Sequence, residues 1–158
     1  MKSIYLLRHA EAEKRSDIKD FERPLTKNGE LEVIDLSKKL LNTDHSFDKI
    51  LCSSSKRTVQ TCTLLLENIN SDLPITKIDS LYNPFIKNML DAISTLDNSC
   101  NHILIVSHNP TISEFANYLL GYKKQQLSFD TANMAKLNLS IDSWEDIHEG
   151  CGDTSFFL

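Results

Sequence analysis

The chain has 158 residues, of which 41% are hydrophobic and 25% charged, and 17 basic against 22 acidic side chains give a net charge of −5. This composition predicts one domain over residues 1–158, with a core that needs no disulfide or metal staple. The acidic balance and the absence of a Lys- or Arg-rich run argue against nucleic-acid binding. No apolar stretch reaches the length of a membrane span and the N-terminus lacks a signal-peptide pattern, so we expect a cytoplasmic protein that does not bind membranes.

The four cysteines, at positions 52, 62, 100 and 151, show neither the CxxC spacing of a redox motif nor the spacing of a zinc site. Cys52 and Cys62 lie in apolar surroundings. We therefore expect both to be small buried hydrophobic side chains.

The first elements alternate between strand and helix. Residues 2–7 form an apolar run typical of a buried strand, and residues 11–22 read as a polar surface loop. A helix is predicted over 27–41 with Thr26 as its N-cap, and Gly29 is a weak helix former in its first turn. Its expected buried stripe consists of Leu31, Val33, Ile34, Leu36, Leu40 and Leu41.

The middle of the chain continues the alternation. A strand is predicted over 47–52, followed by three serines, one of which would cap a helix over about 56–67. A shorter strand candidate covers 74–78, and a modest helix is expected between residues 85 and 96. The side chains expected to face inward from these two helices are Val59, Cys62, Leu65, Leu66, Met89, Ile93 and Leu96.

Residues 102–107 are a continuous apolar run, typical of a central parallel strand that is covered on both faces. The next helix is expected to have Asn109 as its cap and Pro110 at its first position, and to stop at Gly121. Residues 134–139 suggest an edge strand, beside which residues 144–147 would pair.

Alternating strands and helices predict an α/β fold, a three-layer α/β/α sandwich with a mostly parallel sheet. Ligands of such sheets bind outside the carboxyl ends of the strands. Three polar groups follow three of the predicted strands: Arg8-His9, Ser53 to Arg57, and Ser107-His108. We therefore expect two histidines and two arginines to meet at one rim of the sheet.

These residue types suit the handling of a phosphoryl group. Arg8 and Arg57 can bind phosphate oxygens with their forked guanidinium groups, and His108 can donate a hydrogen bond. His9 can attack phosphorus through a ring nitrogen and hold the phosphoryl group covalently until water releases it.

The motifs resemble those of the histidine phosphatase superfamily, which has the phosphoglycerate mutase-like fold. Arg8-His9-Ala10 is similar to its RHG or RHA signature, residues 53–61 to its second motif, and residues 107–110 to its third. The short length and three further segments resemble the small SixA-type phosphohistidine phosphatase branch. These segments are residues 23–29, residues 81–83 and the tail from Trp144 to Gly152.

The resemblance implies that His9 is the nucleophile and that Arg8, Arg57 and His108 form the phosphate pocket. Arg23 would be a fourth, branch-specific cation, with a loop arginine bound to backbone carbonyls as the alternative. The arginines would supply the positive charge, so no metal or other cofactor is implied. We expect a monomer, since no coiled coil or long exposed apolar stripe demands assembly.

The chemistry of the leaving group narrows the choice of substrate class. Ester-cleaving members of the superfamily use a carboxylic acid to protonate the leaving oxygen, and Asp79, Asp91, Glu11 and Glu13 offer no convincing motif for one. An imidazole has a pKa near neutrality and leaves more easily than an alkoxide. The sequence therefore favours phosphohistidine on a protein, such as a phosphotransfer domain, as the substrate, and phosphate or vanadate as pocket ligands. A small-molecule phosphomonoesterase of the same superfamily and a non-catalytic phosphohistidine-binding module are the alternatives.

Overall fold

The computed structural model describes residues 1–122 and 126–158, and its strands form one six-stranded sheet in the order β3-β2-β4-β1-β5-β6. The four strands β3, β2, β4 and β1 are parallel, whereas β5 runs antiparallel to β1 and β6 antiparallel to β5. This confirms the expected α/β fold with a mostly parallel sheet. The strands are β1 (Lys2–Arg8), β2 (Lys49–Ser53), β3 (Ile75–Ile78), β4 (His102–Ser107), β5 (Met134–Leu139) and β6 (Gly152–Phe157).

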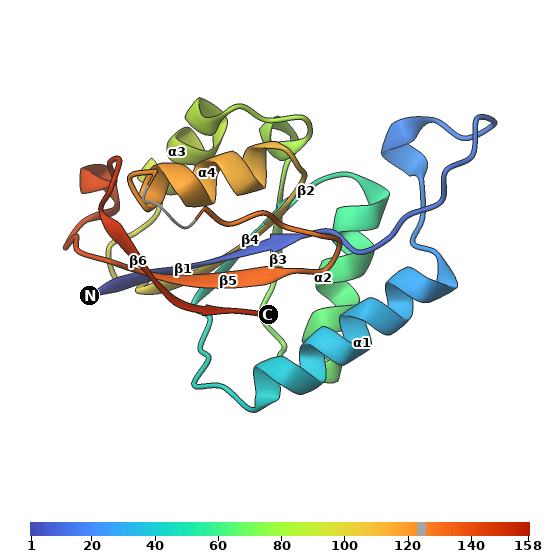
Figure 1. Ribbon diagram of the computed structural model, residues 1–158, viewed down its shortest axis with the longest axis horizontal. Coiled ribbons are helices and arrows are strands. Elements are labelled where there is room, and N and C mark those ends of the chain that lie inside the picture. Colours follow the sequence, from blue (N-terminus) through green and yellow to red (C-terminus); the bar gives the residue numbers. More distant parts are fainter. Residues whose placement is uncertain (123–125) are drawn as a thin grey trace.

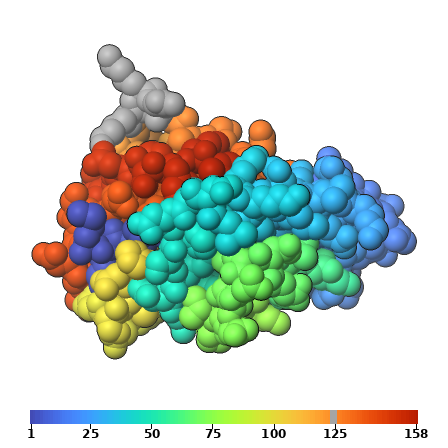
Figure 2. Space-filling view, turned by 90° about the horizontal axis from the view of Figure 1, so that it is seen from below, coloured from blue at the N-terminus to red at the C-terminus, as the bar shows by residue number. Residues whose placement is uncertain are grey.

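Helices cover both faces of the sheet, so the predicted three layers are present (Figure 1). The helices are α1 (Lys27–Leu41), α2 (Lys56–Asn68), α3 (Ile86–Ser94) and α4 (Thr111–Leu119). Alternate residues of β1 enter two different cores: Ile4 and Leu6 pack with side chains of α3 and α4, and Tyr5 and Leu7 with those of α1 and α2. Figure 2 looks onto the second of these layers, with α1 in blue to cyan and α2 in green.

Helix α1 has the predicted bounds, and the Thr26 hydroxyl caps it by accepting a hydrogen bond from the Gly29 N–H at 2.9 Å. The predicted stripe was partly wrong, since Leu31 and Leu41 are 63% and 51% exposed. Residues of one helical face recur three and four positions apart, and six apolar residues spread over more than one face. The buried face consists of Gly29, Val33, Leu36, Ser37 and Leu40.

Helix α2 also matches its prediction, with Cys62, Leu65 and Leu66 buried and Val59 only partly buried. Ser55 is its N-cap by position but makes no side-chain capping hydrogen bond. Cys62 and its neighbour in the core, Cys52, are fully buried free cysteines, as expected.

Three expectations for the last two-fifths of the chain were wrong. Helix α4 begins after Pro110, and the Asn109 amide does not cap it but donates to the Phe129 carbonyl at 2.7 Å. Strand β5 lies inside the sheet, because β6 pairs with its outer side. Residues 144–146 form a short 3-10 helix rather than a strand, and the Trp144 ring is buried in the core.

The strand register brings the carboxyl ends of the parallel strands together. Arg8 at the end of β1 pairs with Ser107 at the end of β4, and Cys52 near the end of β2 pairs with Val106. The chain segments that follow these strands therefore start from one rim of the sheet, as the sequence predicts. In the described part of the chain, no helix combines the length and apolarity needed to span a membrane.

Candidate active site

The rim of the sheet holds a cavity of about 340 Å³. All five predicted site residues line it, and Glu11, Lys14 and Asn83 are among the other lining residues; the five are Arg8, His9, Arg23, Arg57 and His108. Three arginines and Lys14 surround this one cavity, and their positive charges create a strong preference for an anion.

The His9 ring is held in one tautomer. Its Nδ1 lies 2.7 Å from the Ala10 carbonyl oxygen, which can only accept, so Nδ1 carries the proton. Arg57 donates its Nε–H to the other ring nitrogen, Nε2, at 3.3 Å. Burial is the largest cause that lowers the pKa of His9 to about 4, and the charges of Arg57, Arg8 and Arg23 lower it further. At neutral pH the ring is uncharged, with its lone pair on Nε2.

Arg57 follows the N-terminus of α2 and is 5% exposed. Besides His9, its guanidinium contacts the second site histidine: Nη2 lies 3.3 Å from His108 Nδ1. The two imidazole ring centroids are 5.2 Å apart, so one arginine spans both histidines. A phosphoryl group bound between the rings would meet this guanidinium directly.

His108 has the opposite tautomer. Arginine can only donate, so His108 Nδ1 is an acceptor and the neutral ring carries its proton on Nε2, 2.7 Å from the Ser53 hydroxyl oxygen. Burial is again the first cause that lowers the pKa of His108, here to about 3, followed by the charges of His9 and Arg57. The neutral N–H thus points to Ser53, and His108 can donate through Nδ1 only after it gains a proton.

The other two arginines approach the cavity from different segments. Arg8 donates from Nη1 to the Phe129 carbonyl at 2.9 Å, while its buried Nε has no hydrogen-bond partner within residues 1–122 and 126–158. Arg23 lines the cavity and also donates to the Glu13 carbonyl at 2.8 Å. Arg23 therefore has both of the features that the sequence offered as alternatives: it is a cation at the cavity, and it is a loop arginine bound to a backbone carbonyl.

The sequence motifs hold one another in place through a threonine. The Thr61 hydroxyl donates to the Arg57 carbonyl at 2.7 Å and accepts from the Ala10 N–H at 3.0 Å. One side chain of α2 thereby links the second motif to the residue that follows His9. This contact gives a physical reason for a small hydroxyl residue four positions after Arg57.

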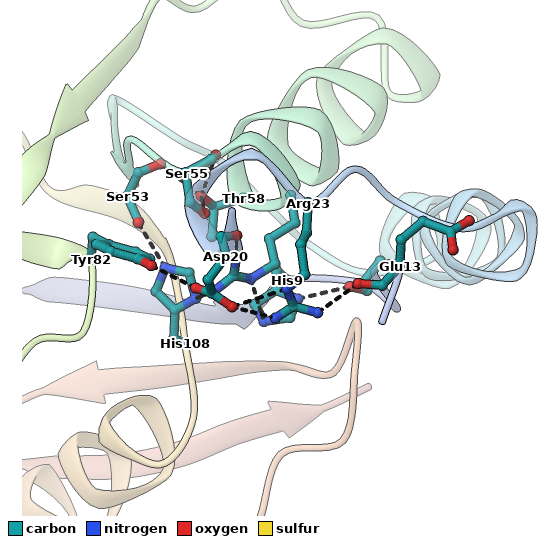
Figure 3. A network of polar contacts seen from close by, with 11 residues as sticks. His9, Glu13, Asp20, Arg23, Ser53, Ser55, Thr58, Tyr82 and His108 are labelled. Carbon is teal, nitrogen blue, oxygen red and sulfur yellow. Dashed lines mark hydrogen bonds and ion pairs between the residues drawn. The ribbon is translucent and has the colours of Figure 1, made fainter. Parts of the chain in front are cut away.

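Sequence reasoning missed two residues, Asp20 and Tyr82. Asp20 lies in a 3-10 turn of the loop that follows β1, and its carboxylate bonds to Arg23, Arg57 and the Tyr82 hydroxyl (Figure 3). The Tyr82 ring packs edge-on against His108, with centroids 5.7 Å apart. No local periodicity marks either residue; the only signals were that Tyr82 lies within the SixA-like segment 81–83 and that Asp20 shortly precedes the SixA-like segment 23–29.

Three of the four carboxylates that could serve as proton donors do not line the cavity. Asp79 accepts a short hydrogen bond from Ser54, and Asp91 pairs with Lys87 at 2.7 Å. Figure 3 shows the Glu13 carboxylate directed away from His9. Glu11 lines the cavity, and its two carboxylate oxygens accept hydrogen bonds from Thr26 and Asn28 at 2.7 and 3.2 Å.

Comparison with known proteins places this arrangement in a family. The model of the histidine phosphatase superfamily (branch 1) matches residues 4–85. Uncharacterized protein Rv1276c of Mycobacterium tuberculosis is 27% identical over 153 residues, which cover 92% of this chain and 94% of that protein.

Solved structures show the same fold over almost the whole chain. The structure of a proposed phosphohistidine phosphatase SixA from Agrobacterium tumefaciens has a TM-score of 0.84 and 25% identity, covering 99% of this chain and 97% of that one. The protein histidine phosphatase SixA in complex with tungstate has a TM-score of 0.83 and 21% identity, covering 99% and 96%. An Escherichia coli protein described as an α-ribazole-5′-P phosphatase scores 0.72 at 19% identity, covering 90% and 93%.

The family match extends over just more than half of the chain and includes His9, Arg8, Arg23 and Arg57. The remaining site residue, His108, lies beyond it, on the segment that the fold brings to the same cavity. The chain belongs to the histidine phosphatase superfamily, branch 1, and is a phosphatase.

Proposed function

We propose that this protein removes the phosphoryl group from phosphohistidine on another protein, with His9 as the nucleophile. In the first half-reaction the His9 Nε2 lone pair attacks phosphorus, and the P–N bond to the substrate imidazole breaks. In the second, water attacks phosphorus, the P–Nε2 bond breaks with its electron pair returning to His9, and the water proton passes to the departing phosphate. Phosphate is released, and the proton stays on Nδ1, hydrogen-bonded to the Ala10 carbonyl, throughout.

The charge needed for this transfer comes from the arginines. Arg57 lies against both histidines, and Arg8 has a buried Nε without an acceptor in the described residues. A buried donor with no partner is costly, so a phosphoryl oxygen at this point would be stabilised. Arg23, which also lines the cavity, would add a further contact to the phosphoryl oxygens.

His108 would change its protonation state when the phosphoryl group binds. The negative charge of the group favours the imidazolium, which can then donate from Nδ1 while Nε2 stays on Ser53. Without an anion, burial keeps the ring neutral. His108 therefore contributes a charge only when the ligand that needs it is present.

The single observation that carries the choice of substrate is the set of hydrogen bonds at Asp20, the carboxylate that is bonded directly to the site arginines: Arg57, Arg23 and the Tyr82 hydroxyl all donate to it. The hydrogen bond from Tyr82, followed by the charges of Arg57 and Arg23, lowers the pKa of Asp20 to about 2. Such a carboxylate has no proton to give to an alkoxide at neutral pH. An imidazole leaving group needs that proton far less, because its own pKa lies near neutrality. The neighbouring SixA structures agree with this choice.

The test is turnover of a phosphohistidine protein and of para-nitrophenyl phosphate, measured side by side for the wild type and for His9→Ala. We expect the wild type to prefer the P–N substrate, and His9→Ala to be inactive on both. A wild-type preference for the phosphate ester would instead support a small-molecule phosphomonoesterase, and would point to Glu11 as a proton donor. Binding of the phosphohistidine protein without turnover would support a recognition module.

A further inference from the structure

Asp20 makes more contacts to the site arginines than any other carboxylate in residues 1–122 and 126–158. Its Oδ2 accepts from Arg57 Nη2 at 3.2 Å and from the Tyr82 hydroxyl at 2.6 Å. Its Oδ1 accepts from Arg23 Nε at 2.9 Å. Its backbone carbonyl accepts a second hydrogen bond from Arg57, from Nη1 at 2.7 Å.

These contacts fix the orientation of the Arg57 guanidinium. The two Asp20 oxygens hold the Nη1 and Nη2 side of the group, which leaves Nε against His9 and the rest of Nη2 against His108. Arg57 emerges from the start of α2, whereas Asp20 belongs to the loop between β1 and α1. The orientation of the Arg57 guanidinium therefore depends on the loop between β1 and α1, and not on α2 alone.

Tyr82 holds Asp20 in turn. Its hydroxyl donates to Asp20, and its ring contacts Phe21 edge-on with centroids 5.1 Å apart. The Arg57 guanidinium carbon lies 5.9 Å from the centre of the same ring. Figure 3 shows the carboxylate between the Tyr82 ring and the side chains of Arg23 and His9. Three chain segments therefore meet at one carboxylate beside the nucleophile.

We propose that Asp20 is a positioning residue for phosphoryl transfer: it orients the Arg57 and Arg23 guanidiniums toward the cavity and does not itself bind the phosphoryl group. The proposal rests on the phosphatase activity of this site and applies to phosphohistidine and to phosphate esters alike. Asp20 is acidic, so its charge repels a bound phosphoryl group while its hydrogen bonds arrange the groups that attract it. Removing the charge therefore lessens the repulsion of a bound anion, whereas losing the orientation of the guanidiniums slows the transfer. This contrast separates a positioning role from a purely structural one.

The decisive variant is Asp20→Asn, which keeps the size of the side chain and removes its charge. We expect kcat on the substrate that the wild type uses fastest to fall by about tenfold to hundredfold, because a small misplacement of a charged group has an effect of this size. The affinity for tungstate, measured by calorimetry, should stay the same or increase, since a repelling charge has gone.

Asp17→Asn is the matched control. Asp17 lies in the same loop, three residues away, and its ion pair is with Arg15 at 2.6 Å, on the protein surface. This variant removes the same charge from the same segment, and we expect kcat and tungstate affinity to match the wild type. Tyr82→Phe removes one donor from Asp20 and keeps the charge, so it should lower kcat less than Asp20→Asn and should not tighten tungstate binding.

A second readout follows the guanidinium itself. The Arg57 Nε–H should give a distinct signal in ¹⁵N-edited NMR spectra of the wild type and of Asp17→Asn, and should broaden or shift in Asp20→Asn as the group becomes mobile. A kcat within twofold of the wild type would overturn the proposal. So would parallel losses of kcat, tungstate affinity and thermal stability, because Asp20 would then only hold the loop in its folded position. Failure of the phosphohistidine assignment would appear separately, as a preference for the ester in every variant.

Discussion

Arg57 donates its Nε–H to His9 Nε2 at 3.3 Å, so a permanent cation contacts the lone pair of the proposed nucleophile. A protonated His9 could not accept this hydrogen bond. The contact and the buried position of the ring act together to keep the imidazole neutral. Burial and the Arg57 contact therefore both make protonation of His9 unfavourable.

The first prediction concerns stability at acidic pH. An unfolded histidine has a pKa of about 6.5, whereas burial lowers that of folded His9 to about 4. Between these values the unfolded chain binds more protons than the folded one, so the free energy of unfolding falls as the pH is lowered from 6.5 to 4. The His9 contribution is about 3.5 kcal/mol at most, at ~1.4 kcal/mol per pKa unit.

Urea denaturation at a series of pH values measures this effect. The His9→Asn variant lacks the titrating ring, so its unfolding free energy should fall less steeply over that interval than the wild-type value. His108, with a pKa lowered to about 3, should produce a similar loss that extends to lower pH. Parallel curves for the wild type and His9→Asn would show that His9 titrates alike in both states.

The second prediction concerns the tautomer of His108. Ser53→Ala removes the only hydrogen-bond partner that Nε2 has in residues 1–122 and 126–158. A lost buried hydrogen bond costs about 1–2 kcal/mol, so we expect turnover to fall by about tenfold. Ser54→Ala is the neighbouring control: this hydroxyl bonds to Asp79 and not to a site histidine, and the variant should keep wild-type turnover. Equal rates for both variants would remove Ser53 from the site.

The third prediction concerns Gly29, where the chain cannot accept a side chain. A Cβ added at this position would lie 2.1 Å from the carbonyl oxygen of Glu11, a backbone atom in the segment that leaves His9. Gly29→Ala should therefore lower the free energy of unfolding by about 1–3 kcal/mol, even though alanine is the better helix former. Glu30→Ala, on the exposed side of the same turn, should change stability by less than about 0.5 kcal/mol. A gain in stability for Gly29→Ala would mean that the Glu11 segment moves away freely.

The fourth prediction follows from the arginines as the source of positive charge. Dephosphorylation should proceed unchanged in the presence of EDTA, because Arg8, Arg23 and Arg57 occupy the positions at which a metal ion would compensate phosphate charge. Vanadate or tungstate should inhibit competitively by occupying the same cavity. Loss of activity with chelator and its recovery with a divalent cation would contradict this, as would turnover that vanadate does not affect.

Much of the fold was predictable because it depends on local patterns. Runs of apolar residues located the parallel strands, and the bounds of α1 and its Thr26 cap follow from helical spacing and capping chemistry. One general rule of parallel sheets then brought Arg8, His9, Arg57 and His108 to a common rim. The resemblance to the family motifs predicted phosphate-handling roles for the same residues.

The sequence pattern could not predict those features of the fold that depend on contacts between distant segments. The six apolar residues of α1 do not reveal which of them the sheet covers, and Leu31 proved exposed for this reason. The strand after β5 was misplaced, because the pairing of β6 is set by an edge that only the assembled sheet offers.

The same physical reason separates the site residues that the sequence by itself determined from those that the tertiary structure decided. Arg8, His9 and His108 lie at or just after the ends of strands. The pairing of those strands in the sheet is enough to bring these residues together. Asp20 and Tyr82 lie 62 positions apart in the chain, and their hydrogen bond exists only where two loops cross above the rim. A loop carboxylate has no periodicity to reveal its partner, so the tertiary structure alone places it on the arginines.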